Sequence, residues 1–145
     1  MPGTGLNMGW SNVTVTPASS TAIVVDNVTE LHPDRKGTAK KFFGDVSAFP
    51  KLIVSRNKSR TVTITSGDIA KLAAIPEDVP CTVTATFNDP LNGATTGGGG
   101  ILYTFVNAVC IDNGSKGATQ EFGLGTAMFE AYSTAGADPL TVTNV

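Results

Sequence analysis

The chain has 145 residues, a formal net charge of −2, and charged residues at only 15% of its positions. This length suits one domain, residues 1–145, which can bury a core without disulfide bonds. No apolar run approaches the ~20 residues of a membrane-spanning helix, so we expect neither a membrane partner nor a secretory signal.

The N-terminal third reads as short strands followed by a long basic segment. Residues 1–11 are glycine-rich and aperiodic, which predicts a flexible or partner-docking N-terminal arm. Residues 12–16 and 21–28 predict two strands. The next segment holds two prolines, two glycines and four basic residues, and it predicts a long inter-strand loop at about 33–49.

Two strands and the only helix signal follow this loop. Strands are predicted at 51–57 and 60–66, joined by a turn at residues 58–59. Ser66 precedes an apolar stripe with i, i+3, i+4 spacing, and Pro76 ends that stripe. This pattern predicts one short helix at about 67–75.

The remaining segments are strand-like and separated by turn residues. Strands are predicted at 80–88, 101–111, 118–133 and 140–145, with a turn at 112–114. Together these patterns predict a mainly β domain, a β-sandwich or barrel of about eight short strands with one flanking α-helix. We expect a single core that contains Val62, Ile64, Ile69, Leu72, Val83, Phe105 and Phe129.

The charge distribution is strongly uneven. Eight of the ten lysine and arginine residues lie between positions 35 and 60, where Asp45 is the only acid, so this basic window carries +7. Three interpretations remain open for it: a nucleic-acid contact, a solvated loop, or a self-association loop anchored by Phe42 and Phe43. The sequence pI of 5.2 and the lack of an aromatic platform on a predicted strand argue against nucleic acid.

No set of residues predicts catalysis or a cofactor. His32 is the only histidine and precedes a proline in the basic segment, which predicts an exposed loop residue. No zinc spacing, nucleophile motif or Walker motif occurs, and Cys81 and Cys110 are expected to be buried, reduced thiols. We therefore expect no enzyme activity, metal, cofactor or small-molecule ligand.

Four segments resemble the tail tube (major tail) proteins of long-tailed bacteriophages, and together they cover roughly residues 20–143. The segments are DNVTELHPDRKGTAKKFFGDVSAFP, RTVTITSGDIAKLAAIP, PCTVTATFNDPLNGATTGGGGILYTFVNAVC and EFGLGTAMFEAYSTAGADPLTVT. The resemblance is one of pattern and order. It implies a non-enzymatic virion protein, made in the host cytoplasm, whose hexameric rings stack into a hollow tail tube through which DNA passes without specific binding.

The resemblance also implies partners and an interface. The partners are other copies of the chain and other phage tail proteins, with ring stacking through the long loop. The expected contact residues are Arg35, Lys36, Lys40, Lys41, Phe42 and Phe43, and the candidate acidic counter-face consists of Asp112, Glu121 and Glu130. Alternative functions are a head-decoration or head–tail joining protein, or a nucleic-acid-binding module that uses residues 35–60.

Overall fold

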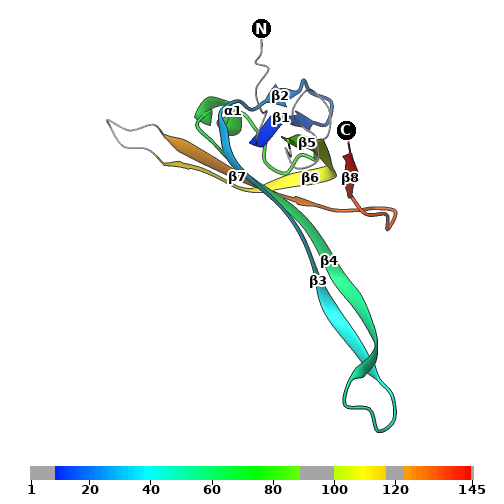
Figure 1. The fold of residues 1–145 in the computed structure, drawn as a ribbon. Helices are drawn as coiled ribbons and strands as arrows, with labels where there is room; N and C mark the ends of the chain where they lie inside the picture. The colour runs from blue at the N-terminus through cyan, green and yellow to red at the C-terminus, as the bar shows by residue number, and fades with distance from the viewer. Residues whose placement is uncertain (1–8, 89–99, 117–122, 145) are drawn as a thin grey trace.

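The computed structural model describes residues 9–88, 100–116 and 123–144 (Figure 1). Eight strands form one antiparallel sheet in the order β2-β1-β5-β6-β7-β4-β3, with β8 also paired to β6. The elements are β1 (Gly9–Pro17), β2 (Ile23–Val24), β3 (Val28–Phe43), β4 (Pro50–Ser66), α1 (Ile69–Ala73), β5 (Cys81–Asn88), β6 (Gly100–Lys116), β7 (Leu124–Ala131) and β8 (Leu140–Asn144). The expected mainly β fold with one short helix is confirmed.

Strand β6 divides this sheet into two halves. Its first part pairs with β5 on one side and β8 on the other, whereas its second part pairs with β7. The change falls at Asn107, whose φ of 52° is left-handed, a conformation that asparagine tolerates better than most residues. The sheet therefore folds so that β1 and β5 face β4 and β7, but it does not close into a barrel.

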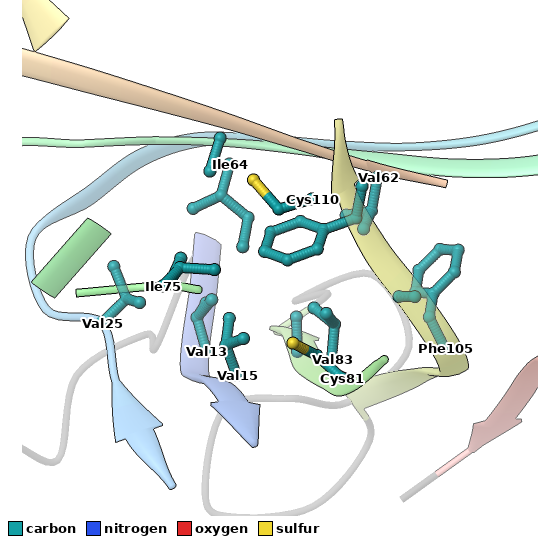
Figure 2. Close-up of a cluster of buried hydrophobic side chains, with 14 of the residues drawn as sticks. Val13, Val15, Val25, Val62, Ile64, Ile75, Cys81, Val83, Phe105 and Cys110 are labelled. Carbon is teal, nitrogen blue, oxygen red and sulfur yellow. The ribbon is translucent and has the colours of Figure 1, made fainter. Parts of the chain in front are cut away.

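The hydrophobic core fills the space between these two halves (Figure 2). Alternation explains its composition, because Val62 and Ile64 on β4 are fully buried while the intervening threonines point to the other face. The expected core residues Val62, Ile64, Leu72, Val83, Phe105 and Phe129 are all confirmed. The prediction for Ile69 is wrong: it is only half-buried, because α1 is too short to turn a broad face to the sheet.

Contacts with neighbouring elements hold helix α1 in place, because an isolated helix of five residues is not stable in water. The Ser66 hydroxyl accepts the N–H of Asp68 at 2.9 Å, and Asn113 donates its side-chain amide to the Leu72 carbonyl at 2.8 Å. A Cβ at Gly125 on β7 would lie 2.8 Å from the Leu72 Cδ1. Glycine at this position thus allows the helix to pack closely on β7.

Two predicted turns are instead parts of continuous strands. Residues 51–57 and 60–66 belong to one strand, β4. The register shifts opposite Gly37 in a β-bulge, where Asn57 adopts a φ of 52°, and the strand continues past it. The stretch 112–114 likewise lies inside β6. The strand expected at 21–28 shortens to β2, which pairs with β1 through two residues.

The expected long loop at 33–49 is also wrong, because most of it is strand. β3 and β4 pair from Val28↔Ser66 to Phe43↔Pro50, which leaves only residues 44–49 as a loop. Pro33 is tolerated because β3 is an edge strand of the sheet, where a missing N–H need not break a ladder hydrogen bond. The segment predicted as a loop is therefore a long β-hairpin.

The expected N-terminal arm is tested only in part, because residues 1–8 lie outside the described residues. Residues 9–11 belong to β1, so this part of the predicted arm is wrong. Trp10 is held there by tilted ring contacts with Phe87 at 5.1 Å and Tyr103 at 5.5 Å. The same packing extends the core toward the end of β5.

Candidate self-assembly surface

The β3–β4 hairpin extends well beyond the body of the protein (Figure 1). β7 pairs with β4 only as far as Arg60↔Ala131, so beyond this pair β3 and β4 hydrogen-bond only to each other. No residue from 36 to 58 is buried. This projecting segment, residues 36–58, is called the distal hairpin below.

Both faces of the distal hairpin combine a lysine with a phenylalanine. Because side chains alternate along a strand, Lys40 and Phe42 share one face, and Lys41 and Phe43 share the other. The paired strand adds aliphatic side chains, with Val54 opposite Lys40 and Ile53 opposite Lys41. Neither face is covered by any other described part of the chain.

The exposed apolar surface of the protein is concentrated here. Of the thirteen exposed large hydrophobic side chains in the described residues, seven lie between positions 42 and 54. Phe49 is 80% exposed, and Val46 is fully exposed with a φ of 55°, which is unusual for a β-branched residue. Strained and exposed apolar groups at one place are typical of an interaction surface.

The positive charge of the distal hairpin is largely uncompensated. Within the described residues, Lys36 pairs with Asp34 at 3.3 Å, and Arg60, at the root of the hairpin, pairs with Asp138 at 3.0 Å. The other basic residues of the window make no ion pair there and are exposed: Arg35, Lys40, Lys41, Lys51, Arg56 and Lys58. The surface is thus apolar at its tip and basic along its length.

The residues expected to form the contact lie together on β3, all of them exposed. They occupy two levels: Arg35 and Lys36 at the root of the hairpin, and residues 40–43 toward its tip. Sequence reasoning missed Leu52 and Ile53 on β4, which are 55% and 58% exposed. The available signal was an apolar run inside the basic window, but a strand in that position was expected to bury one face.

The three candidate counter-face acids are not in one place. Glu121 lies outside the described residues. Asp112 is exposed on β6, beside the Asn113 that contacts α1. Glu130 is exposed on β7 opposite Thr61, at the root of the hairpin. Their contact with another copy stays a prediction.

A second surface lies on the outward face of β3, β4 and β7. The registers align its side chains in three rows: Glu30–Thr65–Thr126, His32–Thr63–Met128 and Asp34–Thr61–Glu130. Three of these nine side chains are acids and four are threonines, so the face is acidic and polar although Asp34 pairs with Lys36. His32 is part of this strand face and not of a loop, which corrects the prediction made from its proline neighbour.

The described residues contain no group of three or more histidine, cysteine or acidic side chains that could hold a metal ion. Cys81 and Cys110 are free and buried, as expected, and burial is the main cause that raises the pKa of both thiols. Among the described residues, no helix is long and apolar enough to cross a membrane.

Comparison with known proteins gives a match in structure but not in sequence. No family model and no curated protein matches the sequence. The fold is similar to that of a chain in the cryo-EM structure of an extracellular contractile injection system, the PVC sheath–tube complex in its extended state. The TM-score is 0.57 at 12% identity, over 92% of this chain and 89% of that chain. This likeness establishes a shared fold over nearly the whole length.

Proposed function

We propose that the protein is a structural subunit of a phage-type tail tube, in which hexameric rings stack into a hollow channel for DNA. The observation that carries the proposal is the distal hairpin, an apolar and basic element that contributes no buried residue to the core of the protein. The similar fold in a sheath–tube complex and the order of elements along the chain support it. Its partners would be copies of itself and other tail proteins.

The hairpin would act by combining steering with burial. Exposed lysines attract an acidic surface from a distance and fix the register of the contact. They affect the rate and register of association more than its affinity. The apolar side chains supply the stabilisation, at roughly 1.5–3 kcal/mol for each phenylalanine fully removed from water. Phe42 and Phe43 are 42% and 59% exposed, so only part of that amount is available from each ring.

The outward face of β3, β4 and β7 would line the channel. A tube that conducts DNA must not retain it. Acidic side chains repel phosphate, and uncharged hydroxyl groups lack the positive charge that makes phosphate binding strong. The threonines of β5 also point away from the core, but they lie on the opposite half of the folded sheet. Only one of the two outward faces can line a given channel, and the acids Glu30, Asp34 and Glu130 favour the first.

Electron microscopy of the purified protein tests this function. Wild-type protein should form six-fold rings and tubes, and the double variant Lys40→Glu/Lys41→Glu should stop at rings or monomers with an unchanged circular dichroism spectrum. The control variant Lys40→Arg/Lys41→Arg keeps the charge and should form tubes. Normal tubes from the Glu variant would exclude the hairpin from the contact.

One observation favours a second function, nucleic-acid binding. Phe42 and Phe43 lie exposed on a basic two-stranded ribbon, so the sequence-based objection that the basic window has no aromatic side chains on a strand is wrong. DNA-binding measurements separate the two functions. Tight retention at ~50 mM salt that is lost by ~200 mM would favour this second function, whereas the tube proposal expects little affinity at either concentration.

A further inference from the structure

One side of the distal hairpin carries an apolar cluster next to a lysine. Directly opposed residues of an antiparallel ladder point to the same side, so Phe42 lies beside Leu52, and Lys40 lies beside Val54. The phenylalanine, the leucine and the valine are all exposed. These four residues are called the Phe42 face below.

The other side of the hairpin has the same character. Lys41 and Phe43 alternate with the β3 residues of the Phe42 face, so they point the other way, and Ile53 lies opposite Lys41. Phe43 and Ile53 are both exposed. These three residues are called the Phe43 face. The hairpin is thus apolar and basic on both sides, whereas a body strand such as β5 buries alternate residues in the core.

A partner that covered one side only would leave the other apolar cluster in water, where it stabilises nothing. Sheets that pack face to face lie about 10 Å apart, so layers on both sides of the hairpin would stand about 20 Å from each other. In the described part of one copy, the space between the two half-sheets is already filled by the core (Figure 2). One copy therefore offers the hairpin a surface, and covering both sides takes two copies.

The distribution of charge identifies the occupant of each side. The basic window carries +7 and the whole chain −2, so the rest of the chain carries −9. Like charges repel, so the hairpin is attracted to the acidic body of another copy and not to another hairpin. Lys40 and Lys41 present a positive charge on opposite sides, so this attraction acts on both faces.

We propose that the distal hairpin of each copy inserts between the bodies of two other copies. The Phe42 face packs on one of these copies, and the Phe43 face packs on the other. This inference rests on the proposed function and adds to it the number of partners that one hairpin joins. Each hairpin then links three chains, so the loss of either face weakens assembly.

Variants of one face at a time test whether both faces are covered. Phe42→Ser/Leu52→Ser removes the exposed apolar pair of the Phe42 face. The matching variant of the Phe43 face is Phe43→Ser/Ile53→Ser. Each should raise the protein concentration needed for tubes roughly tenfold or more, because the burial of two apolar side chains is lost. All four positions are exposed, so both variants should unfold in urea near the wild-type midpoint.

The matched controls keep both positions of a face apolar. They are Phe42→Leu/Leu52→Met and Phe43→Leu/Ile53→Met, and both should form tubes near the wild-type concentration. If one of the two serine variants assembles like the wild type, its face is uncovered, and the inference is overturned while the hairpin keeps its role. If both serine variants assemble normally, the hairpin is excluded as well. Wild-type protein that forms neither rings nor tubes would refute the proposed function itself.

Photo-cross-linking counts the partners directly. The photoreactive analogue p-benzoylphenylalanine replaces Phe42, Phe43 or both in an affinity-tagged chain, which assembles with an excess of untagged wild-type chain. On irradiation, tubes that contain the tagged chain should give two-chain products from either single replacement and three-chain products from the double replacement. Only two-chain products from the double replacement would place both faces on one copy and would overturn the inference. The absence of any product from one of the single replacements would overturn it too.

Discussion

Removing the distal hairpin should leave the body of the protein folded. We consider a variant in which residues 37–58 are replaced by Asn-Gly, a pair that favours the tight turn of a two-residue hairpin. The flanking pair Lys36↔Ser59 is already in register, so the shortened strands can close without moving the sheet. The change tests whether the hairpin serves stability or assembly.

The expected effect on stability follows from burial. None of the 17 buried hydrophobic side chains in the described part of the chain lies between positions 37 and 58, so no core contact is lost. The buried side chains nearest to the deletion are Leu31 and Val62. They keep their partners across the β3–β4 ladder, Ile64 and Pro33 respectively. The deleted pairs are exposed on both faces and stabilise little, while a shorter connection lowers the entropic cost of loop closure. We expect the free energy of unfolding to change by no more than about 1 kcal/mol.

Urea denaturation followed by circular dichroism measures this change, and sedimentation velocity measures assembly. The shortened variant should unfold in one transition near the wild-type midpoint and sediment without forming stacks. A loss of more than about 2 kcal/mol would show that the hairpin packs on the body, which would refute the description of it as a projecting element. Stacking by the shortened variant would refute its role in assembly.

Two further changes test the core and the Arg60–Asp138 ion pair at the root of the hairpin. Ile64→Ala removes a fully buried side chain between the two half-sheets and should cost about 2–5 kcal/mol in urea unfolding; a cost below about 1 kcal/mol would contradict the core packing. The hydrogen bond from Arg60 is the main cause that lowers the pKa of Asp138, so this carboxylate stabilises the fold above its unfolded pKa of about 3.9 and loses that effect as the pH falls through the lower folded value. Asp138→Asn should therefore lower the free energy of unfolding near neutral pH and should reduce the loss of stability below about pH 4. Because Asp138 is 47% exposed, the change in stability should be small. An acid-unfolding profile identical to that of the wild type would contradict a stabilising Arg60–Asp138 ion pair.

The sequence by itself determined those elements in which local pattern and burial agree. The alternation Thr61-Val62-Thr63-Ile64 predicted both the strand and its buried face, because a side-chain period of two leaves only one arrangement with the apolar residues inside. The one short helix was also predicted, since an apolar stripe of helical spacing followed by a proline has few alternatives. The basic window was evident from the sequence alone.

Only the tertiary structure decided what the basic window is. A strand exposed on both faces has no alternation to detect, and Pro33 and Gly37 are turn signals wherever pairing with a neighbour does not override them. Pairing with β4 supplies the missing hydrogen bonds and converts the predicted loop into a projecting hairpin. The hollow of about 280 Å³ beside α1 could not be predicted either, because its lining comes from Ile69 and Leu72 of α1, Asn113 of β6 and Gly125 of β7, which meet only when the sheet folds over its core.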